Sequence, residues 1–261
     1  MKKLENILKE LKSVVVAYSG GLDSTFLLKV AIDTLGKQNV LAVTARSETY
    51  PNSEYKEAVC IAKRMGAPHQ ALKTSELNIK NFRDNPVNRC YYCKKELFKK
   101  LDAIRRKRGL RYVIDGTNFD DLKDIRHGRK AAKEFGVRSP LLEAGIGKTD
   151  IRKYSKKLKL PTWDKPSFAC LASRIPFDTP ITLEALDRVA KAEDAIRRLG
   201  FRQIRVRIHG KIARIEIANK DLAKAVRLGD LIVKILRGLK FTYVTLDLAG
   251  YRTGSLHEAL Q

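Results

Sequence analysis

The chain has 261 residues, of which 44% are hydrophobic and 31% charged, and its formal net charge is +24. These values are typical of a folded globular protein and exclude a disordered chain. No apolar run approaches the ~20 residues that a membrane-spanning helix needs, and the start, MKKLENILKELKS, lacks the features of a secretory signal peptide. We therefore expect a cytoplasmic protein, in which structural disulfides are rare.

The large positive charge favours partners that are anions, such as nucleotides, phosphorylated substrates or RNA. Basic segments such as KKELFKKLDAIRRKRGLR are typical of amphipathic helices whose charged side chains face water. These segments lack the interleaved aromatic residues on which nucleic-acid bases stack. We therefore expect a nucleotide-type small-molecule substrate rather than tRNA, and RNA binding by the basic surface remains an alternative.

Helices and short apolar strands alternate through the first two thirds of the chain. In chain order, the pattern predicts a helix at about 3–12, a strand at 13–18, a helix at 23–36, a strand at 39–45, a helix at 53–66, a strand at 68–73, a helix at about 94–108, a strand at 111–117, and helices near 126–135 and 149–158. Continuous apolar strands between helices indicate a parallel sheet covered on both faces. Residues 1–178 are therefore predicted to form an α/β domain with a doubly wound parallel sheet.

The pattern changes between Pro176 and Pro180. The remaining elements are expected to be a helix at 182–199, strands at 202–210 and 211–218, a helix at 219–237 and a strand at 241–248. The turn HGK between the first two of these strands indicates a hairpin, and hence antiparallel pairing. Residues 179–261 are therefore predicted to form a small α+β C-terminal domain.

The segment AYSGGLDST, residues 17–25, lies between the first predicted strand and the next helix. Gly20 and Gly21 allow backbone N–H groups to turn toward an anion, which the start of the helix also favours. Ser19 and Ser24 add hydroxyl donors, and Asp23 is a candidate ligand of Mg²⁺. No lysine follows the glycines at the spacing of a Walker A loop. An ordinary capped glycine turn is the alternative.

The pattern Ser-Gly-Gly-x-Asp-Ser resembles the PP-loop of the ATP pyrophosphatase superfamily, whose members adenylate their substrates. The resemblance implies that the loop binds the β,γ-pyrophosphate of ATP, so that the reaction releases pyrophosphate and transfers AMP. It also implies that the adenine lies at the end of the second strand, at Thr44, Ala45 and Arg46.

A second segment, DGTNFDD at 115–121, also ends a predicted strand. Ligands bind at the carboxyl ends of parallel strands, so Gly116 is expected to approach the nucleotide closely. Asp121 is a candidate contact for metal or substrate, and Arg126 for a phosphate. Helix capping or a solvated loop charge is the alternative for each acidic residue.

Three of the four cysteines occur in two motifs, NRCYYCKKELF (88–98) with Cys90 and Cys93, and KPSFACLASRIP (165–176) with Cys170. A Cys-x-x-Cys pair can hold a metal, cycle between redox states or form a disulfide. The fourth cysteine, Cys60, is expected to pack in an amphipathic helix as a small apolar residue.

These motifs, together with AYSGGLDST, RSPLLEA, KTDIRK, RVRIHGKIARIE and YVTLDLAGYRTGS, resemble the LarE family of sulfur transferases, which mature the nickel-pincer nucleotide of lactate racemase. The resemblance covers most of the chain. It implies an AMP-forming, ATP-dependent sulfurtransferase that adenylates a carboxylate of a pyridinium dicarboxylate mononucleotide. Sulfur then replaces AMP and gives a thiocarboxylate.

One kind of LarE protein gives up the sulfur of a single cysteine, and another kind has three cysteines that hold a [4Fe-4S] cluster. With Cys90, Cys93 and Cys170, this sequence resembles the second kind, and the expected catalytic residues are these cysteines and Asp23. Three thiolates on a four-iron cluster leave one iron open to an added sulfide, whose source is unknown. Zinc, which would need a fourth ligand, and a redox pair remain alternatives.

The predicted strand RVRIH places Arg205 and Arg207 on one face, where two arginines can bind a phosphate. An ion-pair lattice with Glu216 would explain the pattern equally well. The LarE resemblance implies substrate contacts in the motif after Cys170 and in this strand pair, across a homo-oligomer interface, and the expected residues are Ser173, Arg174, Arg205, Arg207 and Glu216.

Two other enzyme classes fit parts of the sequence. A PP-loop tRNA thiolase would use the same loop and cluster, but the chain has no further Cys-x-x-Cys ribbons and no added RNA-binding domain. An ammonia-using amidating enzyme similar to NAD or GMP synthetase would use the loop and hold zinc at the cysteines.

Overall fold

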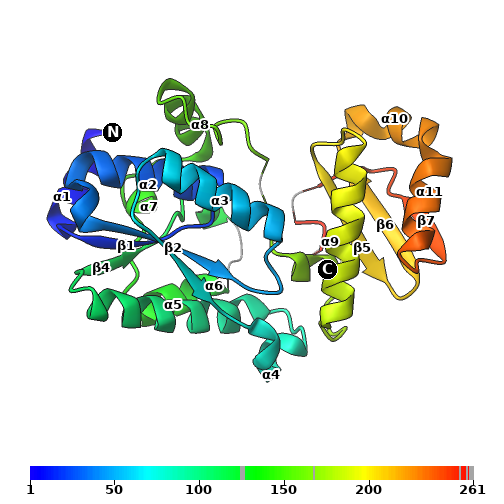
Figure 1. Ribbon diagram of the computed structural model, residues 1–261, viewed down its shortest axis with the longest axis horizontal. Coiled ribbons are helices and arrows are strands. Elements are labelled where there is room, and N and C mark those ends of the chain that lie inside the picture. The colour runs from blue at the N-terminus through cyan, green and yellow to red at the C-terminus, as the bar shows by residue number, and fades with distance from the viewer. Residues whose placement is uncertain (124–126, 167, 253, 257, 259–261) are drawn as a thin grey trace. The chain divides into compact units, whose positions relative to one another are not determined.

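The computed structural model describes residues 1–261 except 124–126, 167, 253, 257 and 259–261, and the chain divides into two compact units (Figure 1). The first unit contains residues 1–82 and 88–168, and the second contains residues 83–87 and 169–261. The division after residue 168 precedes the boundary expected at 178, because the segment that carries Cys170 packs within the second unit. Among the described residues, every helix is too short or too polar to cross a lipid bilayer.

Four parallel strands form the sheet of the first unit, in the order β3-β2-β1-β4. Their bounds are β1 (Val14–Ala17), β2 (Val40–Arg46), β3 (His69–Lys73) and β4 (Tyr112–Ile114). Beyond β4, Arg138 extends the sheet through a single parallel bridge to Ile114. The predicted parallel α/β fold is confirmed.

Helices cover both faces of this sheet because alternate residues of each strand point to opposite sides. Val14 and Val16 pack on one face with helices α1 (Lys2–Leu11), α2 (Leu22–Leu35), α3 (Asn52–Arg64), α7 (Pro140–Glu143) and α8 (Lys148–Lys157). Val15 and Val43 pack on the other face with α5 (Arg89–Lys107) and α6 (Gly128–Glu134), as Figure 1 shows. Shorter elements of this part are η1 (Lys37–Asn39), η2 (Glu76–Asn78), α4 (Lys80–Arg83) and η3 (Phe119–Lys123).

The second unit has a three-stranded mixed sheet in the order β5-β6-β7. Strands β5 (Ile204–His209) and β6 (Ile212–Ile217) form the predicted antiparallel hairpin, and β7 (Tyr243–Leu246) runs parallel to β6. The helical elements are η4 (Leu171–Arg174), α9 (Leu183–Arg198), η5 (Asn219–Asp221), α10 (Leu222–Arg227) and α11 (Gly229–Gly238). The single helix expected at 219–237 was wrong, because the chain interrupts the helix before Gly229, a residue of low helix propensity.

Asn85 explains why the short segment 83–87 belongs to the second unit. Its side chain is fully buried, and its Nδ2 donates to the carbonyl oxygens of Pro176 at 2.6 Å and Thr179 at 2.8 Å. Its own carbonyl accepts from the backbone N–H of Asp178 at 3.1 Å. The backbone φ of Asn85 is +59°, a conformation that asparagine tolerates better than most residues.

We expect Asn85→Ala to lower the free energy of unfolding by about 2–4 kcal/mol, because buried carbonyl groups lose their donor and alanine is strained at positive φ. Denaturant unfolding measures this change. The control is Asn52→Ala at the exposed start of α3, which should change stability by less than about 0.5 kcal/mol. Equal effects of the two substitutions would contradict the role assigned to Asn85.

Candidate active site

The loop between β1 and α2 has the backbone conformation of an anion-binding turn. Gly20 has a φ of +64°, and a Cβ built there would lie 2.5 Å from the Cβ of Ala58 on α3. Gly21 precedes the first residue of α2 as its N-cap, so the N–H groups of the first helical turn open toward the loop. The loop predicted to bind phosphate therefore lies at the carboxyl end of β1 and requires glycine at position 20.

The two serines of this loop bond to each other. The Oγ atoms of Ser19 and Ser24 lie 3.1 Å apart, and the backbone N–H of Ser19 donates to the Oγ of Ser24 at 3.2 Å. Hydroxyl groups exchange such partners readily, so both are donors for a bound anion. Asp23 lies in the first turn of α2, where its carboxylate is the kind of ligand that Mg²⁺ prefers.

Donors from outside the loop contact two of its carbonyl groups. The Tyr50 hydroxyl donates to the Ser19 carbonyl oxygen at 2.6 Å, and the Lys165 ammonium donates to the Gly20 carbonyl oxygen at 3.4 Å. Sequence reasoning missed both residues. The signal available for Lys165 was its place in the same motif as Cys170, whereas no local pattern marks Tyr50.

The segment after β4 packs directly against the phosphate loop. A Cβ on Gly116 would lie 3.0 Å from the backbone nitrogen of Ser24, a tight contact, so this approach favours glycine. The neighbouring Asp115 is buried, and its carboxylate accepts from the hydroxyls of Thr117 at 2.9 Å and Ser139 at 2.7 Å. These bonds fix the end of β4 beside the loop.

The buried carboxylate of Asp121 is held by neighbouring groups of the chain. It accepts from the backbone N–H of Asn118 at 3.1 Å, and the Lys148 ammonium lies 4.0 Å away. The structure thus shows Asp121 holding the turn that follows Gly116. Arg126, expected to contact a phosphate, lies outside the described residues.

Thr44, Ala45 and Arg46 form the carboxyl end of β2, where the adenine was expected. Thr44 is buried, and its Oγ1 is 2.9 Å from Nε2 of His69. Burial lowers the pKa of His69, so its imidazole is neutral near pH 7. The Arg46 guanidinium lies 5.5 Å from the centre of the Tyr55 ring.

The cysteines of the Cys-x-x-Cys pair lie about one turn apart at the start of α5. The helix begins at Arg89, earlier than expected, and residues three positions apart share a helix face, so Cys90 and Cys93 lie side by side. Cys90 is exposed, and Cys93 and Cys170 are partly buried. The packed position expected for Cys60 was wrong, because this residue lies on the exposed side of α3.

The three motif cysteines are divided between the units. Cys90 and Cys93 belong to the first unit and Cys170 to the second. Within the described residues, no group of three His, Cys, Asp or Glu side chains is arranged to hold a metal ion.

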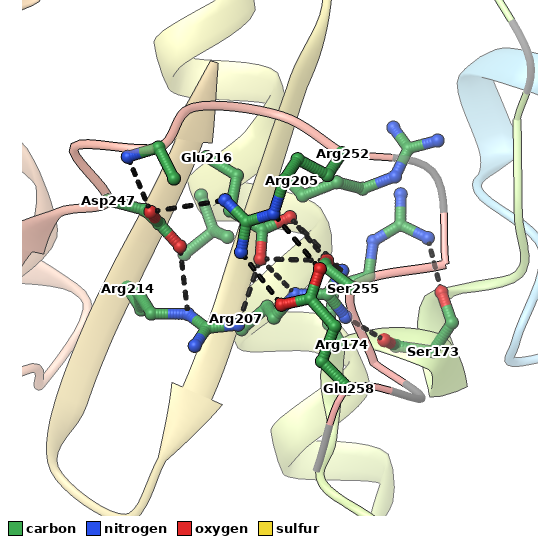
Figure 2. Close-up of polar contacts among 12 residues, drawn as sticks. Ser173, Arg174, Arg205, Arg207, Arg214, Glu216, Asp247, Arg252, Ser255 and Glu258 are labelled. Carbon is green, nitrogen blue, oxygen red and sulfur yellow. Dashed lines mark hydrogen bonds and ion pairs between the residues drawn. The ribbon is translucent and has the colours of Figure 1, made fainter. Parts of the chain in front are cut away.

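A buried arginine fixes the segment that carries Cys170 (Figure 2). Arg174 donates to both carboxylate oxygens of Glu193 on α9, at 2.8 and 2.9 Å. Its Nη1 also donates to the carbonyl oxygens of Ala169 at 2.6 Å and Cys170 at 2.9 Å. The Ser173 hydroxyl donates to the same Cys170 carbonyl at 2.8 Å. Ser173 and Arg174, expected to contact substrate, thus hold the backbone of Cys170.

Arg205 and Arg207 lie on one face of β5, as their alternation predicts. Arg207 donates to both carboxylate oxygens of Glu216 on β6 and to the Ser173 carbonyl oxygen at 2.7 Å. It also donates to the Ser255 hydroxyl at 2.6 Å, so the C-terminal segment joins this network (Figure 2). The ion-pair lattice considered from the sequence is therefore present.

Arg205 is held differently. Its Nη1 donates to the Ile204 carbonyl oxygen at 2.7 Å, and its guanidinium lies 5.3 Å from the centre of the Tyr251 ring. Burial, together with the charge of Arg174, lowers the pKa of Arg205 to about 10. Arg205 therefore still carries its charge at neutral pH.

Charges of both signs are buried in this cluster. The buried residues are Arg174, Arg205, Arg207, Glu193 and Glu216. Each glutamate pairs with an arginine, Glu193 with Arg174 and Glu216 with Arg207.

Comparisons with known proteins identify the family of this chain. The NAD synthase family model matches residues 2–111, the part that contains the phosphate loop. The pyridinium-3,5-bisthiocarboxylic acid mononucleotide synthase of Lactiplantibacillus plantarum is 39% identical over 97% of this chain and 92% of its own length. The chain belongs to the family of this synthase. The resemblance to the LarE family is thereby confirmed.

Two further relatives mark the extent of the similarity. An uncharacterized protein of Synechocystis is 46% identical over 99% of this chain and 98% of its own length. A glutamine-dependent NAD(+) synthetase of Aquifex aeolicus is 32% identical over 25% of this chain and 12% of its own length. The similarity to the LarE relatives therefore includes both units, whereas the similarity to the NAD synthetase is local.

We expect Gly20→Ala to weaken binding of ATP by more than about tenfold, because a Cβ there collides with α3 and displaces the loop. Isothermal titration calorimetry measures this affinity. Gly229→Ala is the matched control, since a Cβ at that position has no atom within 4 Å. Unchanged ATP affinity in Gly20→Ala would show that the nucleotide binds elsewhere.

Proposed function

We propose that this protein is an ATP-dependent sulfur transferase that converts a carboxylate of a pyridinium dicarboxylate mononucleotide into a thiocarboxylate. The observation that carries the proposal is the similarity to the Lactiplantibacillus plantarum synthase, which covers 97% of this chain and therefore both units. ATP use is expected of a PP-loop enzyme, and the glycine-dependent loop after β1 supports it.

The first step is adenylation of the substrate. One carboxylate oxygen attacks the α-phosphorus of ATP, a new O–P bond forms, and the bond to the β,γ-pyrophosphate breaks. The N–H groups of the loop and of the first turn of α2 stabilise the negative charge of the departing pyrophosphate. Asp23 in that turn would hold Mg²⁺, which would supply positive charge to offset the negative charge of the phosphates.

The second step replaces AMP with sulfur. A carboxylate is a poor electrophile, whereas its mixed anhydride with AMP has a good leaving group. A sulfur nucleophile of the hydrosulfide class attacks the carbonyl carbon, a C–S bond forms, and the C–O bond to AMP breaks. The products are a thiocarboxylate and AMP.

The three motif cysteines are the groups that would hold a [4Fe-4S] cluster. Thiolates are the ligands of such clusters, and Cys90 and Cys93 lie one helical turn apart. The Cys170 backbone is fixed by the buried Arg174, as a positioned ligand requires. When bound, such a cluster supplies an iron that is open to an added sulfide.

The buried arginine cluster is proposed to bind the phosphate of the substrate. Arg205 and Arg207 share one face of β5 and are both buried, and guanidinium groups are well suited to hydrogen bonds with a phosphate. Glu216 holds Arg207 by two bonds, which fixes the direction of its guanidinium.

Turnover of pyridinium dicarboxylate mononucleotide with ATP, Mg²⁺ and sulfide tests the function. Mass spectrometry should detect the thiocarboxylate product in the wild type. We expect Cys170→Ala to form AMP but to lose at least about 90% of the thiocarboxylate, because adenylation does not need the thiol. Cys60→Ala should keep both activities, since Cys60 lies outside the motifs.

Iron and acid-labile sulfide are measured on the same anaerobically reconstituted proteins. We expect about four irons per chain in the wild type and in Cys60→Ala, and a marked loss in Cys170→Ala. Full thiocarboxylate formation by Cys170→Ala would refute the sulfur-transfer role of this cysteine. One zinc per chain without labile sulfide would refute the cluster.

A further inference from the structure

Two residues that are distant in the sequence donate hydrogen bonds to carbonyl oxygens of the phosphate loop. The Tyr50 hydroxyl donates to the Ser19 carbonyl oxygen at 2.6 Å, and the Lys165 ammonium donates to the Gly20 carbonyl oxygen at 3.4 Å. All four residues belong to the first unit. The two contacts are on consecutive peptide groups of the loop.

These contacts also determine the direction of the N–H groups in the same two peptide groups. In a trans peptide, the C=O and the N–H point in opposite directions. The Ser19 carbonyl shares its peptide group with the Gly20 N–H, and the Gly20 carbonyl shares the next one with the Gly21 N–H. A donor that holds each carbonyl oxygen therefore turns the N–H of the same peptide group away from that donor.

The N–H groups of Gly20 and Gly21 are available for a ligand. In the part of the chain that the structure describes, neither the Gly20 nor the Gly21 amide has a hydrogen-bond partner. Two adjacent unpaired N–H groups beside the start of α2 form a concave site for an anion. A rotation of either peptide group would instead present a carbonyl oxygen, which repels phosphate.

We propose that Tyr50 and Lys165 are positioning residues for the phosphates of ATP, which act by holding the Ser19 and Gly20 carbonyl groups away from the nucleotide. This inference rests on the proposed function, because it takes the loop to bind the pyrophosphate part of ATP. Neither residue needs to touch the reacting atoms for this role.

Tyr50 is suited to the role because its hydroxyl remains a donor. Burial, with the nearby charge of Glu54, raises the pKa of Tyr50 above the usual value for tyrosine, so the hydroxyl keeps its proton at neutral pH. The rings of Tyr50 and Phe168 pack edge to face, with 6.3 Å between their centres. This contact restricts the orientation of the phenol. An O–H···O distance of 2.6 Å lies in the range of well-formed hydrogen bonds.

Lys165 is fixed by partners on α3. Its ammonium pairs with Glu54 at 2.9 Å and Glu57 at 2.8 Å, and its side chain is only 13% exposed. With the Gly20 carbonyl, these carboxylates give the three N–H donors of the ammonium three acceptors. Arg152 donates to the Lys165 carbonyl oxygen at 3.1 Å and so fixes the backbone as well.

Separate titrations of the full chain with inorganic pyrophosphate and with AMP test this role. Tyr50→Phe and Lys165→Met should each weaken pyrophosphate binding by about three- to tenfold, the factor expected for one lost hydrogen bond. AMP lacks the β,γ-phosphates, so its affinity should change by less than about twofold. Lys165→Arg keeps a charged donor and should recover most of the pyrophosphate affinity.

The controls remove the same groups elsewhere in the first unit. Tyr112→Phe alters β4 at its far end from the loop, and Lys29→Met breaks an ion pair between Lys29 and Asp33 on α2. Both should bind pyrophosphate with wild-type affinity.

The outcomes separate this inference from the function on which it rests. Wild-type pyrophosphate affinity in both Tyr50→Phe and Lys165→Met would overturn the positioning role alone. Equal losses for AMP and pyrophosphate would also overturn it, since they would show a general structural effect. A wild-type chain that binds neither ligand would instead refute the proposed function.

Discussion

The close approach of the phosphate loop to α3 is the constraint on which the first unit depends. Gly20 lies so near Ala58 that a Cβ has no room, and Gly116 packs against the backbone of Ser24 at the start of α2. These two glycines let the ends of β1 and β4 meet at one edge of the sheet. Ligands bind at this edge in open α/β sheets, so the same packing that closes the core forms the proposed nucleotide site.

The second unit depends on buried charge. Arg174 holds the Cys170 backbone from within, and Arg207 holds the neighbouring Ser173 carbonyl. Buried arginines with carboxylate partners are rigid, because breaking one pair leaves the other charge without compensation. The segment after the unit boundary can therefore present its cysteine in a fixed direction, as a sulfur-transfer role requires.

Local patterns were predictable from the sequence, and distant contacts were not. The loop at Ser19–Ser24 and the common face of Arg205 and Arg207 follow from residue spacing alone. Tyr50 and Lys165 reach the loop through tertiary packing, which no local pattern records. Arg174 shows a further limit, because a motif can mark an arginine without revealing that its partners are Glu193 and three acceptors in its own segment.

The loop is proposed to hold the leaving pyrophosphate. The most direct test is therefore to identify which phosphate bond of ATP breaks. ³¹P NMR of the reaction with a mononucleotide whose carboxylates carry ¹⁸O identifies both the products and the attacking oxygen. The account predicts pyrophosphate and AMP, with one ¹⁸O in the AMP phosphate, formed only when the substrate is present. Formation of ADP and phosphate, or AMP without ¹⁸O, would contradict it.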